Sequence, residues 1–397
     1  MSRLWDKGSK LDDRILQFTA GEDHRWDERL VAFDIEGSLG HLMALEAAGH
    51  ISSADANTLR AALDSIAKSH QADEWHISLE EEDSQTAIES RLIKRCGPLG
   101  GRIHLGRSRN DQVLTALRLY LLAESRQLIQ GVQNVIDALE RLVTRQGQCP
   151  LPGYTHMQQA MPSSVGLWAQ GFASELACDR DGINASRRRL SKSPLGSAAG
   201  YGTPGVEYPR YVAAQFLGFD VVHEPVTAVQ LSRGKAESQL LFELHLFMND
   251  AARLAQDLLL FYTQEFAFVR LPESFTTGSS IMPQKRNPDV FELIRGRSAS
   301  SLACLNEALG IFSRLPSGYQ RDLQLIKAPL FRGIDLALAV MDILPTAIDG
   351  VEFQADKIRL DAGIYTAEQA NRIVVNEGIP FREAYRRVGS EINKRQP

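Results

Sequence analysis

One segment, residues 275–289, combines side chains that suit proton abstraction next to a carboxylate. It reads Phe-Thr-Thr-Gly-Ser-Ser-Ile-Met-Pro-Gln-Lys-Arg-Asn-Pro-Asp and lies between two helix-like stretches. Gly278 permits backbone conformations that a Cβ forbids, whereas the prolines restrict the chain around it. The hydroxyl of Ser279, followed by the cation of Lys285, is therefore a candidate base. The competing interpretation is a surface loop with a chance basic pair, since loops are rich in Gly, Ser and Pro.

A second polar segment, residues 106–112, reads Gly-Arg-Ser-Arg-Asn-Asp-Gln and precedes a long helical pattern. A helix start offers free backbone N–H groups, and arginine offers a guanidinium fork. Ser108, Arg109 and Asn110 therefore suit the binding of a carboxylate. The alternative is a capping segment with solvated arginines, in which Asp111 caps the helix.

A third segment, residues 151–158, reads Leu-Pro-Gly-Tyr-Thr-His-Met-Gln and also precedes a helical pattern. Its histidine, His156, is the best acid/base candidate of the chain because imidazole titrates near neutral pH. A lone histidine is more often structural, so both interpretations stay open.

A fourth segment, residues 317–327, carries polar side chains at helical spacing. Gln324 and Lys327 fall on one helical face, and Tyr319 lies in the turn before it. An ordinary amphipathic helix start explains the pattern equally well. A loop of small residues at 194–200 is weak evidence alone, although its backbone has room to approach a ligand closely.

Long helical patterns separate these segments and must hold them in place. Apolar residues recur at steps of three or four over 111–146 and 235–269, and further helices fit 162–190, 288–313 and 331–348. Such lengths exceed the usual ~11–12 residues of a helix. Long helices with apolar stripes pack side by side, so we expect a mainly α fold with a central bundle. Stripes this rich also predict association between several copies of the chain.

Three helical domains are expected. Residues 1–110 form an N-terminal unit, and residues 111–350 form the central long-helix bundle with the loop at 275–289. Residues 351–397 form a short C-terminal unit.

Composition bounds the function. The 397 residues are 44% hydrophobic and 23% charged with a net charge of −5, so nothing global favours nucleic acid or a membrane surface. No apolar run approaches the ~20 residues of a membrane span. Four scattered cysteines are typical of reduced thiols in a cytoplasmic protein. Neither the nine histidines nor the glycines form a metal-binding or nucleotide-binding motif, so no metal or cofactor is expected.

Together these segments resemble the fumarase/aspartase superfamily, whose signature loop matches the Gly-Ser-Ser-Ile-Met-Pro-Gln-Lys-Arg-Asn-Pro run. The segments at 106–112 and 153–158, with the spacing of Tyr319, Gln324 and Lys327, most resemble argininosuccinate lyases and their relatives, the delta-crystallins. The similarity runs from about Leu4 to about Tyr385. The resemblance implies a homotetramer whose central helices form a common core, with each active site built from three subunits. It also implies reversible, cofactor-free cleavage of argininosuccinate to arginine and fumarate, a step of arginine biosynthesis.

The resemblance also implies roles for individual residues. Ser279 would be the base, and His156 would be the acid that protonates the leaving nitrogen, although the two roles could be reversed. Glu292 matches the carboxylate that orients the histidine, and Lys285 would hold the substrate carboxylate whose charge grows. The matching substrate-binding positions are Ser108, Arg109, Asn110, Thr155, Asn287, Tyr319, Gln324 and Lys327.

One departure from the family pattern concerns the first domain, where Gln85 replaces a usual histidine. Two alternative functions stay open. One is a sister lyase of the adenylosuccinate lyase or aspartase type. The other is a crystallin-like structural protein that folds and assembles without activity.

Overall fold

The computed structural model describes residues 12–393, so the start of the family resemblance at Leu4 lies outside the described residues. The chain forms two compact units, each assembled from separate stretches. The first unit contains the residues up to Ile129, together with Asp181–His245 and Ser300–Ala337. The second contains Gln130–Arg180, Leu246–Ala299 and the residues from Leu338 onward.

The first unit begins with a cluster of short and medium helices. They are α1 (Asp13–Ala20), α2 (Asp23–Trp26), η1 (Asp27–Leu30), α3 (Val31–Ala47), α4 (Ser53–Gln71), α5 (Ser84–Cys96), α6 (Pro98–Gly101) and η2 (Arg102–His104). Ser52 and Asp83 cap α4 and α5 by accepting hydrogen bonds from backbone N–H groups one turn later. Apolar side chains such as Leu42, Leu63 and Leu92 from α3, α4 and α5 pack into one buried core.

The long helices follow in both units. They are α7 (Arg109–Gln146), α8 (Val165–Leu190), α11 (Lys235–Tyr262), α12 (Asp289–Phe312) and α13 (Lys327–Asp349). The first unit also holds α9 (Arg210–Phe216), α10 (Ala228–Ser232), η4 (Arg321–Ile326) and the paired strands β3 (Lys192–Ser193) and β4 (Val221–Val222). Within this unit, polar contacts join neighbouring helices. For example, Arg187 of α8 donates to Ser125 of α7 over 2.9 Å.

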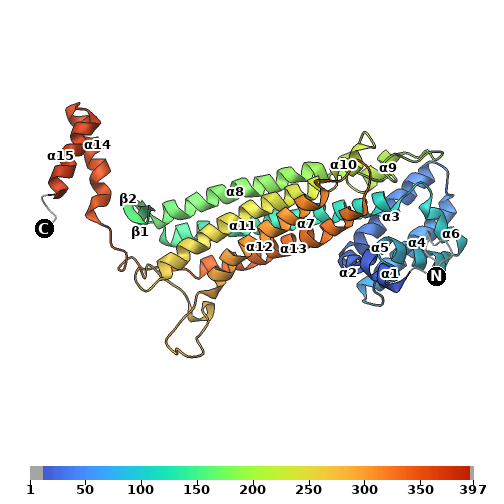
Figure 1. The fold of residues 1–397 in the computed structure, drawn as a ribbon, viewed down its shortest axis with the longest axis horizontal. Helices are drawn as coiled ribbons and strands as arrows, with labels where there is room; N and C mark the ends of the chain where they lie inside the picture. Colours follow the sequence, from blue (N-terminus) through green and yellow to red (C-terminus); the bar gives the residue numbers. More distant parts are fainter. Residues whose placement is uncertain (1–11, 394–397) are drawn as a thin grey trace. The chain divides into compact units, whose positions relative to one another are not determined.

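In the second unit, parts of the same long helices lie side by side (Figure 1). Trp168 of α8 donates to Asp257 of α11 over 2.9 Å, and Arg141 of α7 pairs with Asp349 of α13 over 2.6 Å. Hydrophobic residues such as Leu139, Leu254 and Leu258 are almost completely buried. Apolar burial along the shared faces therefore holds this part of the bundle together.

The second unit also contains short strands and terminal helices. They are β1 (Pro150–Thr155), β2 (Gln158–Ser164), β5 (Val269–Arg270), η3 (Glu273–Phe275), β6 (Glu352–Phe353), η5 (Ala362–Tyr365), α14 (Thr366–Glu377) and α15 (Phe381–Asn393). Strands β1 and β2 form an antiparallel hairpin, and β5 pairs with β6. The helices α14 and α15 pack through Ala370, Ala384 and Val388.

The mainly helical fold with its long helices is confirmed, but some bounds differ. The helix predicted over 235–269 ends at Tyr262, because residues from Val269 pair with Glu352–Phe353 instead. The helix predicted over 162–190 begins at Val165, because Pro162 still belongs to β2. The division into three domains stays a prediction. None of the helices in the described part of the chain is long and apolar enough to span a membrane.

Candidate active site

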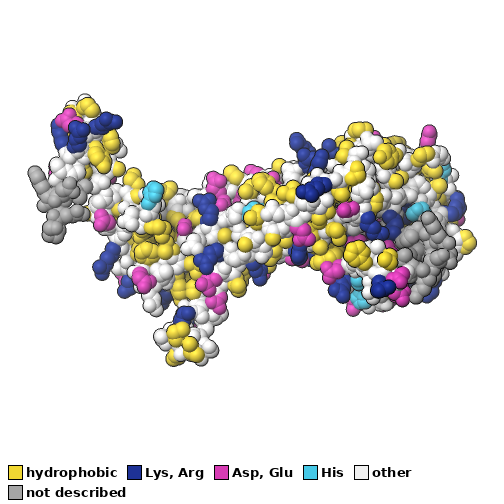
Figure 2. Space-filling model, viewed as in Figure 1, with side chains coloured by type: hydrophobic (Ala, Val, Ile, Leu, Met, Phe, Trp, Pro, Cys, Tyr) yellow, Lys and Arg dark blue, Asp and Glu magenta, His cyan; other side chains and the backbone are white. Residues whose placement is uncertain are grey.

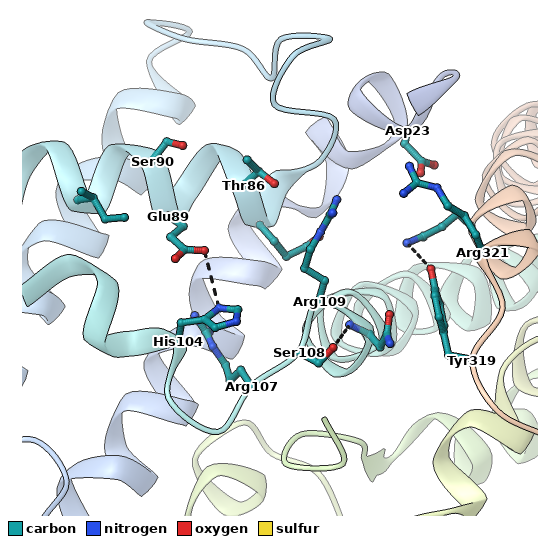
Figure 3. A pocket seen from close by; sticks show the side chains of 14 residues that line it. Asp23, Thr86, Glu89, Ser90, His104, Arg107, Ser108, Arg109, Tyr319 and Arg321 are labelled. Atoms are coloured by element: carbon teal, nitrogen blue, oxygen red, sulfur yellow. Dashed lines mark hydrogen bonds and ion pairs between the residues drawn. The ribbon is translucent and has the colours of Figure 1, made fainter. Parts of the chain in front are cut away.

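A cavity of about 410 Å³ lies in the first unit, where the starts of α7 and η4 approach α5 (Figure 3). It is lined by Asp23, Gln85, Thr86, Glu89, Ser90, Ile93, His104, Arg107, Ser108, Arg109, Asn110, Tyr319, Arg321 and Gln324. Five of the residues predicted to bind substrate are therefore together in one place: Ser108, Arg109, Asn110, Tyr319 and Gln324. They come from two segments that are far apart in the sequence.

The start of α7 is fixed by Asp111, which is fully buried. One oxygen of its carboxylate accepts the N–H of Ser108 over 2.9 Å. The other accepts the N–H groups of Gly196 and Ala198 over 2.9 and 2.8 Å. The small-residue loop therefore anchors the helix start, and the side chains of residues 108–110 face the cavity. Asp111 acts as the anchor, and its neighbours remain available for a ligand.

Tyr319 and Gln324 are linked on the opposite wall of the cavity. Gln324 donates to the hydroxyl of Tyr319 over 3.3 Å. The guanidinium of Arg233, which is 4% exposed, lies 5.2 Å from the centre of the Tyr319 ring. This cation–π contact holds the ring of Tyr319, whose side chain lines the cavity.

Lys327 does not line the cavity but lies buried behind it. Its ammonium is 2.5 Å from Asp27 and 3.0 Å from Asp23. Burial alone lowers the pKa of Lys327, but the two carboxylates more than offset this effect and raise it. Asp23 also lines the cavity, so Lys327 is connected to the site indirectly, by its ion pair with this carboxylate. Direct contact of Lys327 with a substrate stays a prediction.

The remaining charges of the cavity are mixed. Burial, followed by the nearby Arg107, lowers the pKa of His104 to about 4, and burial raises the pKa of Glu89. At neutral pH His104 is therefore an uncharged imidazole beside Glu89, 3.8 Å away. The positive charge of the cavity comes from its arginines, while Asp23 and Glu89 supply carboxylates. Such a lining suits a ligand that carries both carboxylates and cationic nitrogen.

Gln85, at the position where the family usually has histidine, is part of a buried polar network. Its amide donates to Asp34 over 2.9 Å and to Ser84 over 2.8 Å. Burial raises the pKa of Asp34 to about 6, an effect that Arg107 partly offsets. A neutral donor satisfies Asp34 in either protonation state, which explains how glutamine is accommodated here.

The second unit carries the predicted acid at a strained turn. Thr155 pairs with Gln158 at the end of the β1–β2 hairpin, and His156 and Met157 form its two-residue tip. Both tip residues have positive φ, 51° and 60°, where Asn and Gly are usual. Such conformations cost roughly 1–3 kcal/mol each and are concentrated at functional sites. The turn presents His156 to solvent.

The signature loop is folded back on itself in the second unit. Thr277 and Asn287 exchange backbone hydrogen bonds of 3.0 and 2.9 Å at its base. The hydroxyl oxygen of Ser279 accepts the N–H of Met282 over 3.2 Å. A backbone donor of this kind stabilises negative charge on the oxygen and so favours a serine that must lose its proton. Lys285 is exposed farther along the loop.

Glu292 lies in the first turn of α12, directly after this loop. It is exposed, and within residues 12–393 it makes no hydrogen bond or ion pair with His156. The structure thus groups the predicted site residues by unit. The substrate-binding set is in the first unit, except for Thr155 and Asn287. These two lie in the second unit with Ser279, His156, Lys285 and Glu292.

Sequence reasoning missed several residues of the cavity. Asp23, Glu89, His104 and Arg321 line it without having been predicted. Glu89 lies one helical turn after Gln85, and Arg321 lies between Tyr319 and Gln324, so both signals were present in the sequence. Among residues 12–393, no group of three or more His, Cys, Asp or Glu residues has the arrangement to hold a metal ion.

Comparisons with known proteins show the family of the chain. A family model described as a lyase matches residues 12–300. The chain is 43% identical to an argininosuccinate lyase of Sorangium cellulosum, over 98% of this chain and 90% of the relative. It is 38% identical to an argininosuccinate lyase of Bacteroides thetaiotaomicron, over 98% and 87% of the two chains.

Solved structures show the same fold. An EDDS lyase in complex with formate matches with a TM-score of 0.82 at 22% identity, covering 97% of this chain and 77% of that one. A class II fumarase from Schistosoma mansoni matches with a TM-score of 0.77 at 17% identity, covering 94% and 91%. Since a lyase family model matches residues 12–300 and relatives of 38–43% identity cover 98% of it, the chain belongs to the argininosuccinate lyase family.

Proposed function

We propose that this protein catalyses the reversible cleavage of argininosuccinate to arginine and fumarate, as a carbon–nitrogen lyase of arginine biosynthesis. The observation that carries the proposal is the identity of 38–43% with proteins of that name over 98% of the chain. The cavity supports it, because its arginines and carboxylates complement a substrate with both charges.

The proposed reaction is a β-elimination. Ser279 removes a proton from the carbon next to a carboxylate, and negative charge builds up on that carboxylate as an aci-carboxylate. Lys285 and Asn287 stabilise this charge. The carbon–nitrogen bond then breaks, its electron pair stays on the guanidino nitrogen, and His156 supplies a proton there. The opposite assignment of acid and base to His156 and Ser279 is tested below.

We also propose that the protein is a homotetramer and that different copies complete each active site. Large apolar side chains are exposed on the long helices of both units, and hydrophobic surface is visible along them (Figure 2). In the first unit these include Phe242, Leu302 and Leu309, and in the second Leu167 and Leu293. Exposed apolar faces of this kind are typical of surfaces that a further copy covers.

A cytoplasmic location fits the proposal. The four cysteines, Cys96, Cys149, Cys178 and Cys304, are all unpaired, and Cys178 is the exposed one. Unpaired thiols are typical of a reducing compartment.

The test is fumarate absorbance after adding argininosuccinate to the purified protein, with adenylosuccinate and aspartate as parallel substrates. Fumarate from argininosuccinate alone is expected. Fumarate from one of the other substrates would identify a sister lyase. No fumarate from any of them, with a well-folded oligomer, would indicate a structural protein and refute the proposal.

A further inference from the structure

Two guanidinium groups meet in the cavity of the first unit, and both need a counter-ion. Arg109 comes from the first turn of α7, and Arg321 comes from the start of η4 (Figure 3). Burial lowers the pKa of Arg109, Glu82 raises it, and Arg321 lowers it again. The two arginines are therefore close enough to repel each other, and Glu82 offsets that repulsion.

Glu82 is the carboxylate that both arginines share. Its Oε2 lies 3.7 Å from Nη2 of Arg109 and 3.5 Å from Nη2 of Arg321. The residue is 3% exposed, in the turn just before the N-terminus of α5. Arg109 has a second partner in Asp83, and Arg321 also donates to the carbonyl of Thr19 over 2.8 Å. Within residues 12–393, the carboxylate of Glu82 is thus paired with both guanidinium groups.

The backbone of Glu82 is held in an unfavourable conformation. Its φ is +66°, in the left-handed region that side chains longer than Asn or Asp rarely adopt. The fold thus accepts a local cost to place this carboxylate between the two arginines. Strain of this kind is found where a side chain must be held in one position.

We infer that Glu82 is a positioning residue for substrate binding, which sets Arg109 and Arg321 as a paired receptor for a substrate carboxylate. The inference rests on the proposed function. Both arginines keep exposed surface in the cavity, with side chains 25% and 50% exposed. A guanidinium has five N–H donors, so binding to Glu82 leaves donors for a ligand. Held as a pair, they offer a carboxylate two guanidinium groups without reorganisation.

Glu82 could instead weaken anion binding by neutralising the two arginines, and the KM of a variant distinguishes this role from positioning. If its charge merely neutralised the arginines, removing that charge would strengthen binding of an anion. If Glu82 positions them, removing the charge weakens binding. The sign of the change in KM therefore separates the two roles.

The experiment compares Glu82→Gln with Glu81→Gln, using the fumarate assay. Glu81 is the matched control because it is the neighbouring carboxylate of the same loop, yet it pairs with Arg91 over 2.5 Å, outside the cavity. We expect Glu82→Gln to raise KM by about tenfold, in line with the loss of one charge-assisted interaction, with kcat changed by less than about threefold. Glu81→Gln should leave both constants within about twofold.

A second variant keeps the inference testable if Glu82→Gln folds poorly. Glu82→Asp keeps the charge and suits the positive φ better, but its side chain is too short to reach both guanidinium groups. It should also raise KM. An unchanged or lower KM in the folded variants would overturn the inference, as would an equal rise in Glu81→Gln.

The failure of the proposed function is recognised separately, because the wild-type protein would then release no fumarate. In that case calorimetric titration with succinate and with arginine decides the role of Glu82. Whichever probe binds the wild type should bind about tenfold more weakly to Glu82→Gln and unchanged to Glu81→Gln. A wild type that binds neither probe would refute the paired receptor.

Discussion

The ammonium of Lys327 lies 2.5 Å from the carboxylate of Asp27, and both side chains are at most 2% exposed. Asp23, which is 16% exposed and 3.0 Å from the same ammonium, completes a cluster that joins the N-terminal helices to the start of α13. A single ammonium is therefore shared by two carboxylates, one of which, Asp23, also lines the cavity.

Replacing Lys327 by Met should destabilise the protein, because it removes the ammonium that pairs with the buried carboxylate of Asp27 and the half-buried carboxylate of Asp23. The expected loss is about 3–5 kcal/mol of unfolding free energy, measured by urea denaturation. Lys357→Met is the control, since Lys357 is 55% exposed and its ion pair with Asp356 is 3.9 Å long. A loss below about 1 kcal/mol in Lys327→Met would show that the cluster does not stabilise the fold.

Ser279→Ala should lower kcat by at least about 100-fold, since it removes the proposed base. Stability should not change, because the side chain is only half-buried in a surface loop. Ser274→Ala, at an exposed serine before the signature loop, is the control and should remain active. Near-normal turnover of Ser279→Ala would assign the base to another residue.

His156→Asn should also lower kcat by at least about 100-fold and should remove the ionisation of the histidine from the pH–rate profile. Asparagine tolerates positive φ, so the hairpin turn should persist. The neighbouring Met157→Asn is the matched control, because Met157 has the same backbone conformation and is 67% exposed.

If the control loses as much activity as His156→Asn, the turn and not the imidazole would be required. The limb of the profile that disappears also separates the two assignments. Loss of the alkaline limb is expected for an acid, and loss of the acidic limb for a base.

His223 should make stability depend on pH. Burial, together with Arg118, Lys192 and Arg210, lowers its pKa to about 4, and its Nδ1 lies 3.2 Å from Nη1 of Arg118. An unfolded histidine has a pKa of about 6.5, so between pH 6.5 and pH 4 the folded state binds fewer protons than the unfolded state. The contribution of the neutral His223 to the unfolding free energy is therefore fully present above about pH 6.5. It is lost as pH falls toward 4, by at most about 3 kcal/mol.

The check is His223→Asn, which keeps an acceptor for Arg118 but does not titrate. Urea midpoints measured from pH 7 to pH 4 should fall less steeply in the variant than in the wild type. Parallel curves would contradict the lowered pKa.

The sequence predicted the long helices well because their signal is local. The helices predicted over 111–146 and 288–313 lie within about two residues of the observed bounds of α7 and α12. The end of α11 was missed, because Val269–Arg270 pairs with a strand more than eighty residues later in the chain. The β1–β2 hairpin was missed because no Asn-Gly or similar pair marks its turn.

In the candidate site too, residues in short motifs were predictable, whereas residues that depend on distant contacts were not. Residues 108–110, Tyr319 and Gln324 were predicted from short motifs, and the structure places them around one cavity. The role of Glu82 was not predictable, because it depends on Arg321, which lies 239 residues away in the chain. Lys327 was predicted to bind substrate, with an ordinary amphipathic helix start as the alternative. Only its contact with Asp27, 300 residues away, shows that it is buried.

The four thiols differ in exposure, so one of them, Cys178, is suited to selective chemical labelling. Cys178 is exposed on α8, whereas Cys304 is buried and Cys96 and Cys149 are half-buried. A maleimide spin label at low stoichiometry should therefore react first at Cys178 and mark each chain once. Pulsed electron paramagnetic resonance on the labelled protein would then test the proposed tetramer in solution, because a monomer gives no distance between labels.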